Sequence, residues 1–134
     1  MRVVLDTNIF ISGIFWQGKC SKIILLWREK KFDLIVSFSM LEEFVRVLKD
    51  FKIQMPAEAI REWVDMIINN SIVVEPEEKL DVVKSDIKDN IIVEAAVEGR
   101  VDFIVSQDNH LLELKEFRNI RIVGPEDFLN LFSD

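Results

Sequence analysis

The sequence is poor in the residues that mark secreted, membrane-bound or unfolded chains. Its one Cys leaves no internal disulfide, which favours a reducing environment. Four Gly and three Pro leave no stretch with the composition of a linker. No apolar run approaches the length of a membrane span, and Asp6 and Asn8 interrupt the apolar start before a signal-peptide core forms. We therefore expect a cytoplasmic protein with no membrane association.

The chain also has fewer basic residues than acidic ones. The chain has 17 Lys and Arg against 24 Asp and Glu, a net charge of −7. Sequence-blind binding to nucleic acid depends on Lys and Arg that neutralise phosphates, so this balance argues against it. A nuclease is not excluded, because carboxylates gathered at a metal site would account for much of the excess and bound cations would offset it.

Apolar residues, in contrast, make up 49% of the 134 residues, which is enough for one domain spanning residues 1–134. Runs typical of buried strands lie at 2–5, 33–38, 72–75, 102–106 and 121–123. Helical patterns lie at 20–31, 39–50, 56–69, 86–98 and 109–114, and another helix opens at Pro125. This alternation predicts an α/β fold with a central parallel sheet of about five strands, flanked by helices on both faces.

Two residues are expected to mark helix ends. Ser39 is predicted to cap the helix over 39–50, with Glu42 three residues later in a capping-box pattern. Gly99 is predicted to stop the helix over 86–98.

Acids follow two of the expected strands. Asp6 comes directly after the first strand, and Ser106 and Asp108 follow the fourth. If these strands are neighbours where the strand order reverses, the two acids face each other across the crevice at the carboxyl ends of the strands. Taken singly, each acid also suits a turn or a helix cap.

Helical position separates two further pairs of acids. Glu42 lies at the capping-box position and four residues before Arg46, whereas Glu43 lies at the margin of the apolar stripe. Asp89 borders the buried face of its helix, whereas Asp86 points away from it and suits a cap. The simpler alternatives are that Glu43 is an ordinary exposed acid and that Asp89 only favours the positive end of a helix dipole.

A cluster of oxygen ligands with no Cys or His suits Mg²⁺ or Mn²⁺ better than zinc. The candidates are Asp6, Glu43, Asp89 and Asp108. Phosphodiester hydrolysis is a reaction that needs such a cluster, with one or two cations that activate water and stabilise the leaving oxygen.

Four stretches, in order and with similar spacing, resemble the acidic motifs of the PIN-domain ribonucleases. The resemblance is greatest to the short prokaryotic members related to the VapC toxins of toxin-antitoxin pairs. The stretches are residues 5–12 (LDTNIFIS), 37–44 (SFSMLEEF), 86–90 (DIKDN) and 105–112 (VSQDNHLL).

The resemblance implies a three-layer, Rossmann-like fold and a Mg²⁺- or Mn²⁺-dependent endoribonuclease. It implies cleavage of an RNA substrate to a 3′-hydroxyl and a 5′-phosphate, a homodimer, and a small antitoxin protein as partner. Asp6, Glu43, Asp89 and Asp108 match the family's catalytic, metal-binding acids. Asn8 and Ser106 match its supporting polar positions, and His110 falls at a variable one and receives no role.

Two alternatives to a nuclease remain open from the sequence. One is a catalytically silent PIN-fold module that binds RNA or protein. The other is phosphoryl transfer through an aspartyl-phosphate on Asp6, which is disfavoured because Asp6-Thr7-Asn8 lacks a second acid two residues on.

Overall fold

The computed structural model describes residues 1–50, 54–83 and 86–133, which form a six-stranded sheet covered by helices. The strand order is β3-β2-β1-β4-β6-β5, and all neighbours are parallel except β5 and β6. The strands are β1 (Arg2–Leu5), β2 (Asp33–Ser37), β3 (Ile72–Val74), β4 (Phe103–Val105), β5 (Glu116–Phe117) and β6 (Ile120–Val123). The predicted parallel α/β sheet is confirmed for β1, β2, β3, β4 and β6. The sixth strand, the antiparallel β5, was not predicted, because its two residues are too few for a sequence pattern.

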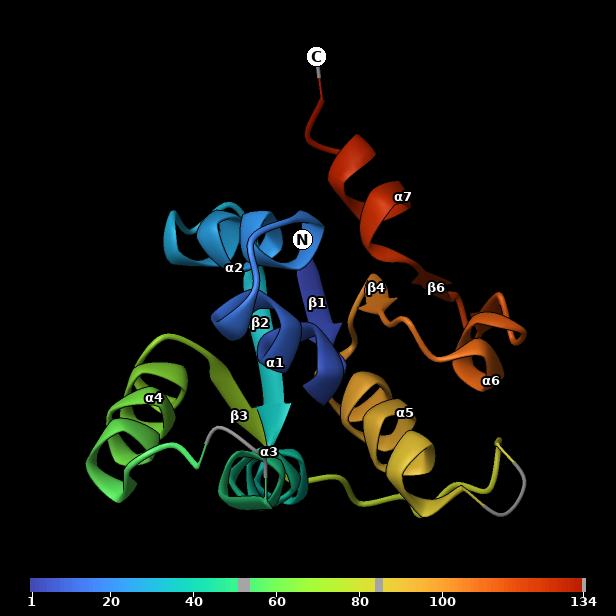
Figure 1. The fold of residues 1–134 in the computed structure, drawn as a ribbon. Coiled ribbons are helices and arrows are strands. Elements are labelled where there is room, and N and C mark those ends of the chain that lie inside the picture. Colours follow the sequence, from blue (N-terminus) through green and yellow to red (C-terminus); the bar gives the residue numbers. More distant parts are fainter. Residues whose placement is uncertain (51–53, 84–85, 134) are drawn as a thin grey trace.

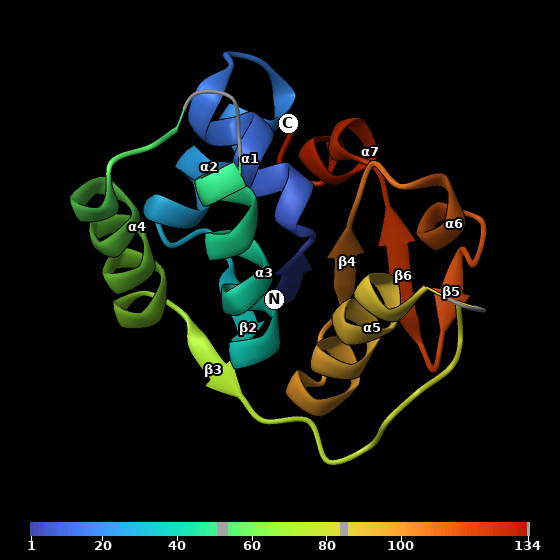
Figure 2. The same cartoon turned by 60° about the horizontal axis from the view of Figure 1, so that its bottom comes forward.

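Helices flank the sheet on both sides. They are α1 (Thr7–Phe15), α2 (Lys19–Arg28), α3 (Phe38–Asp50), α4 (Ala57–Asn69), α5 (Ile87–Gly99), α6 (Asn109–Leu112) and α7 (Pro125–Asn130). In Figure 1 the strands lie between two sets of helices. Helices α2 and α7 are above the strands, and α3 and α5 are below them. Helix α5 packs across β1 to β4, and α2 packs against α7. In the turned view of Figure 2, α3 and α5 lie in front of the strands.

The core is built around β1, a strand that is covered on both faces. Val3, Val4 and Leu5 have no exposed surface, as expected for a strand in the middle of a parallel sheet. On the α7 side, the ring of Phe128 meets that of Phe32 edge to face, with centroids 5.3 Å apart. The buried strands therefore hold the carboxyl end of β1 at a fixed place, where the candidate acids begin.

The N-terminus of α3 differs from the prediction. The helix begins at Phe38, and the Ser37 hydroxyl accepts the backbone N–H of Met40 at 3.2 Å. Ser39 lies inside the first turn, so its assignment as the cap and the capping box with Glu42 were wrong. The reason is that β2 runs directly into α3, which gives the capping position to the last residue of the strand.

The end of α5 also differs from the prediction. Gly99 is still helical, and the left-handed residue that ends the helix is Arg100, with φ of 52°. A Cβ on Gly99 would lie 2.5 Å from Cγ2 of Ile35. The glycine is therefore required by the close approach of α5 to β2, and its assignment as the helix stop was wrong.

Helix α1 starts immediately after Asp6, where the sequence pattern predicted no element. It packs tightly against α2, because a Cβ on Gly13 would lie 2.5 Å from Cγ1 of Ile24. Within the described ranges, no single helix is long and apolar enough to cross a membrane, and α1 and α2 meet those criteria only as a pair bent by 99°.

Candidate metal centre

The first two acids of the site come from the ends of adjacent strands. β1 and β4 are parallel neighbours, with Leu5 paired to Val105, and the Asp6 backbone N–H donates to the Val105 carbonyl at 3.0 Å. β2 and β3 extend the sheet on one side of this pair and β6 and β5 on the other. The predicted reversal of strand order between β1 and β4 is confirmed, and it brings Asp6 and Asp108 to the same crevice.

Ser106 connects the two acids. Its hydroxyl has no exposed surface, donates to Oδ2 of Asp6 at 2.8 Å and accepts the backbone N–H of Asp108 at 2.9 Å. The Asp108 carboxylate in turn accepts the backbone N–H of His110 at 2.7 Å and so caps α6. One buried hydroxyl therefore fixes the side chain of one acid and the backbone of the other.

Asp89 enters the crevice from the first turn of α5. It is only 5% exposed, and its Oδ2 atom is buried with no hydrogen-bond partner among the described residues. Its backbone N–H donates to Oδ1 of Asp86, the N-cap of the helix, at 3.1 Å, as predicted for Asp86. A buried carboxylate oxygen without a partner is costly, and a cation beside it would remove that cost.

The acids repel one another across the crevice. Burial, together with the negative charges of Asp108, Asp86 and Asp6, raises the pKa of Asp89 to about 7. Burial also raises the pKa of Asp6, and the Ser106 hydroxyl opposes that increase because it donates to the ionised form. The ionised forms of Asp6 and Asp89 are therefore destabilised in the folded protein, as is common in sites that bind metal ions or carry out acid-base chemistry.

Glu43 reaches the same cleft from α3. It lies between the buried Phe44 and the exposed Glu42, as its helical position predicts, and its side chain is 14% exposed. Its Oε2 atom lies 2.6 Å from Nη1 of Arg46, and its Oε1 atom lies 3.1 Å from Nζ of Lys88. Arg46 therefore pairs with Glu43, although Glu42 lies at the i, i+4 spacing from it.

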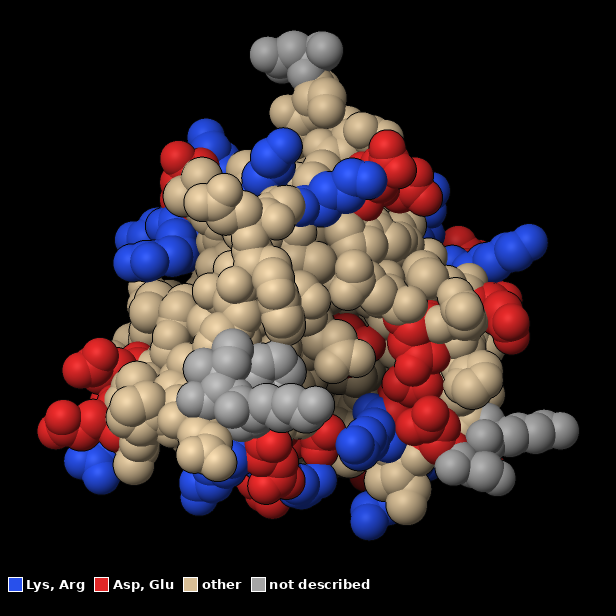
Figure 3. Space-filling model, viewed as in Figure 1, with Lys and Arg blue, Asp and Glu red and all other residues tan. Residues whose placement is uncertain are grey.

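These side chains surround a cleft of about 470 Å³. Its polar and charged lining residues are Asp6, Thr7, Asn8, Ser39, Glu43, Arg46, Asp86, Lys88, Asp89 and Asp108. Figure 3 shows acidic side chains gathered on this face near α5, with basic side chains beside them. The structure thus brings Asp6, Glu43, Asp89 and Asp108 to one cleft, although it does not bring all four to one point.

The tightest group differs from the predicted set. One carboxylate oxygen each from Asp86, Asp89 and Asp108 and a ring nitrogen of His110 lie within 4.8 Å of one another. Asp6 and Glu43 are not part of this group, and Glu43 is paired with Arg46 and Lys88 instead. The spacing of Asp86 and Asp89 already contained a signal, because an N-cap carboxylate that reaches the N–H of the third helical residue must lie beside that residue's side chain.

Asn8 and Asn90 lie near the site and make different contacts. Asn8 is exposed at the edge of the cleft, and its backbone amide lowers the pKa of Asp6. The buried Asn90 side chain accepts the N–H groups of Val82 and Val83 and donates to the Val83 carbonyl, each at 2.9 Å. It therefore anchors the segment that leads into α5.

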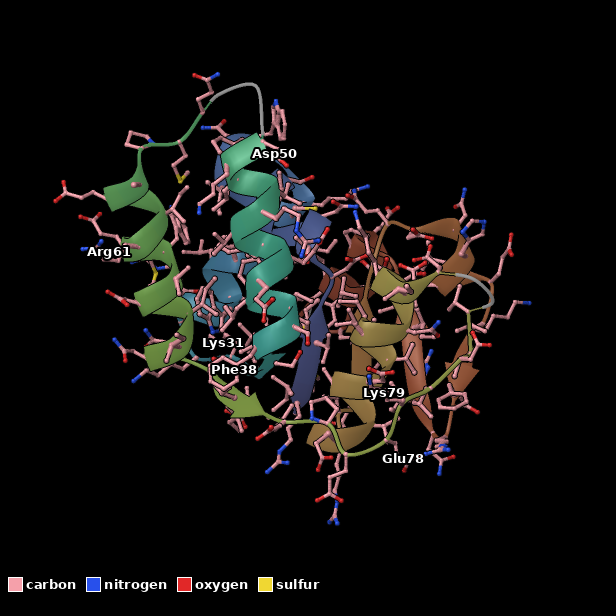
Figure 4. All side chains as sticks on the ribbon, turned by 90° about the horizontal axis from the view of Figure 1, so that it is seen from below. Lys31, Phe38, Asp50, Arg61, Glu78 and Lys79 are labelled. Atoms are coloured by element: carbon pink, nitrogen blue, oxygen red, sulfur yellow. The ribbon has the colours of Figure 1, made fainter. Side chains whose placement is uncertain are left out.

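That segment runs along α5 before the helix begins, and Figure 4 labels Glu78 and Lys79 on it. The Leu80 backbone N–H donates to Glu94 on α5 at 2.8 Å, and the Glu77 backbone N–H donates to Glu98 at 2.9 Å. These contacts hold the segment against the side of α5.

Comparisons with known proteins agree with this architecture. A protein-family model described as the PIN domain matches residues 2–110. VapBC2 from Rickettsia felis, bound to a DNA fragment from its promoter, has a similar fold (TM-score 0.63, 16% identity, 92% of this chain and 98% of that chain covered). VapBC-1 from nontypeable Haemophilus influenzae is also similar (TM-score 0.65, 15% identity, 94% of this chain and 99% of that chain covered). No curated protein matches the sequence significantly.

Proposed function

Because this chain belongs to the PIN-domain family, we propose that it is a divalent-cation-dependent endoribonuclease that leaves a 3′-hydroxyl and a 5′-phosphate. The observation that carries the proposal is the buried, unpartnered Oδ2 of Asp89 in a cleft shared with Asp6 and Asp108. A carboxylate kept at this cost is expected at a cation site, and a metal-dependent nuclease requires such a site.

The donor set fits Mg²⁺ or Mn²⁺. Asp6, Glu43, Asp89 and Asp108 would supply carboxylate oxygens, the ligands that both ions accept. A bound divalent cation supplies activation of water for attack on the phosphodiester and stabilisation of the charge on the leaving oxygen.

The chain's own residues prepare this chemistry. Ser106 orients Asp6 through the 2.8 Å hydrogen bond, and the start of α6 holds Asp108 through the N–H of His110. Asp86 fixes the first turn of α5 and with it the direction of Asp89. Because these carboxylates are positioned before any cation arrives, little reorganisation is needed when one binds.

A toxin-antitoxin role is the second part of the proposal. Two similar structures are VapBC assemblies, and the similarity extends over nearly the whole length of both chains in each comparison. We propose that this chain is likewise a VapC-like toxin, that a small antitoxin protein binds it, and that it forms a homodimer in the cytoplasm. Co-expression with the product of an adjacent small gene, followed by purification through a tag on one chain, tests the antitoxin part.

The nuclease part is tested by incubating purified protein with structured and single-stranded RNAs in Mn²⁺, Mg²⁺ or EDTA. We expect cleavage with metal, none in EDTA, and none from Asp6→Asn. If the wild-type protein binds Mn²⁺ in a manner that Asp6→Asn abolishes, yet cuts no RNA in the panel, a silent binding module becomes the better description.

A further inference from the structure

Within the described ranges, Arg46 and Lys88 are the only basic side chains that line the cleft of the candidate metal site, and both contact Glu43. One cation lies on each oxygen of the Glu43 carboxylate, Arg46 at 2.6 Å and Lys88 at 3.1 Å. They come from different helices, α3 and α5, on opposite sides of the cleft. Both oxygens of the Glu43 carboxylate are therefore paired with protein cations, unlike Oδ2 of Asp89.

The cleft needs positive charge if it is to receive a nucleic acid. Five acids line it, namely Asp6, Glu43, Asp86, Asp89 and Asp108, and the whole chain carries a net charge of −7. Phosphates bind through neutralisation by Lys and Arg, and in the described part of the chain Arg46 and Lys88 are the Lys and Arg side chains in the cleft lining.

Both cations are largely exposed to solvent. The Arg46 side chain is 60% exposed and that of Lys88 is 70% exposed, so each reaches Glu43 from solvent on a long, flexible stem. Ion pairs this exposed contribute little energy, so a divalent cation that binds at the cleft can compete with them for the same carboxylate. Release of Lys88 and Arg46 from Glu43 would then leave two cations at the edge of the cleft.

We propose that Lys88 and Arg46 are phosphate-binding residues that Glu43 holds in place until a divalent cation takes over its carboxylate. In the metal-free protein Lys88 and Arg46 are paired with Glu43, so a divalent cation has to displace them when it binds. In the metal-bound protein they turn to the backbone phosphates of RNA next to the cleft. The inference rests on the proposed function, since it names how that site receives its substrate.

The first arm of the test measures Mn²⁺ binding by electron paramagnetic resonance, without RNA. Lys88→Gln removes one competitor, so we expect its Mn²⁺ affinity to rise about two- to five-fold, the range set by the energy of an exposed ion pair. Lys49→Gln is the matched control, because Lys49 is an exposed lysine on α3 outside the cleft lining and its loss changes the net charge equally.

The second arm measures binding of a fluorescent single-stranded RNA in Ca²⁺ over a range of salt concentrations, with a gel to check that the RNA stays intact. For Lys88→Gln we expect weaker binding and a slope of log K against log salt that is shallower by about 0.7, the loss of one phosphate contact. Lys88→Arg keeps the charge and should restore both the affinity and the slope.

Opposite changes in the two affinities are what distinguish this proposal from a purely structural ion pair. If Lys88→Gln matches Lys49→Gln in both arms, or weakens Mn²⁺ binding, the proposal is overturned while the nuclease assignment stands. If the wild-type protein binds no Mn²⁺ at all, the proposed function and this inference fail together.

Discussion

The Ser106 hydroxyl donates to the Asp6 carboxylate at 2.8 Å, which joins the ends of β4 and β1 across the crevice. Removing it in Ser106→Ala leaves a buried carboxylate oxygen without its donor. We expect a loss of about 1–3 kcal/mol in the free energy of unfolding and weaker Mn²⁺ binding, because Asp6 becomes harder to ionise. Urea unfolding and Mn²⁺ titration measure the two effects.

Ser37→Ala provides the control for this prediction. Ser37 is also a buried serine at the end of a strand, and it caps α3 through the Met40 N–H. Its loss should cost about 1 kcal/mol of stability and leave Mn²⁺ affinity unchanged. Equal losses of metal affinity in both variants would show that Ser106 has no specific relation to the metal site.

Asp6→Asn should stabilise the metal-free protein while it abolishes cleavage. Asp6 is 7% exposed, and burial and the charge of Asp108 both raise its pKa, so a neutral amide of the same shape relieves that cost. We expect a gain of roughly 1 kcal/mol in EDTA. In excess Mn²⁺ the order should reverse, because only the wild-type protein gains the energy of metal binding.

The exposed Asp65→Asn on α4 makes the same chemical change away from the cleft and should alter neither stability nor cleavage by a measurable amount. A variant at Asp6 that still cleaves like the wild-type protein would remove Asp6 from the active site.

Glu43→Gln and Glu42→Gln should differ sharply although the residues are adjacent. Glu43 lines the cleft, whereas Glu42 is exposed and lines a separate groove between α3 and α4. We expect Glu43→Gln to reduce kcat by at least about 10²-fold, the effect of losing a group that supports the metal, and Glu42→Gln to remain near wild type. Steady-state kinetics in Mn²⁺ with a cleavable RNA give the comparison, and similar rates for both variants would contradict it.

The metal-free protein should lose stability as pH rises from about 4 to about 7. The pKa of Asp89 is about 7 in the folded protein and 3.8 in the unfolded chain, so the folded state binds more protons in this window. The free energy of unfolding therefore falls with pH, by up to about 1.4 kcal/mol per pH unit, and levels off above pH 7.

Urea unfolding in EDTA from pH 4.5 to 8 measures this effect, with Asp89→Asn as the reference that lacks the titrating group. The acids Asp6, Asp86 and Asp108 face Asp89 and are present in both proteins. Parallel stability curves for the two proteins would show that Asp89 titrates in its ordinary range.

Gly99→Ala and Arg100→Gly test the end of α5. The new Cβ at position 99 would clash with the buried Ile35, so we expect a loss of about 1–3 kcal/mol despite the better helix propensity of Ala. Arg100 has φ of 52°, so glycine there should stabilise by up to about 1 kcal/mol. Thermal unfolding in EDTA compares both with the wild-type protein, and a stabilising Gly99→Ala would refute the close-packing explanation.

Local sequence patterns predict those structural features that are set by residues adjacent in the chain, such as buried strands and helix caps. A continuous apolar run ending in Asp6 is enough to predict a buried strand with an acid at its carboxyl end. The same holds for Asp86, since capping depends on the next three residues. Gly99 and Ser39 were assigned by the same kind of rule and were wrong, because a contact with Ile35 and the direct junction of β2 with α3 decided their roles.

The sequence by itself determined the α/β class, the positions of β1 and β4, and the acids at their ends, because each follows from hydrophobic runs and their polar terminators. Only the tertiary structure decided which side chains meet. It placed Asp86 and His110 beside Asp89 and Asp108. It also placed Lys88 on Glu43, 45 residues away in the chain. Such pairings arise when the packing of α3 and α5 on the sheet brings distant residues together, and no local pattern contains them.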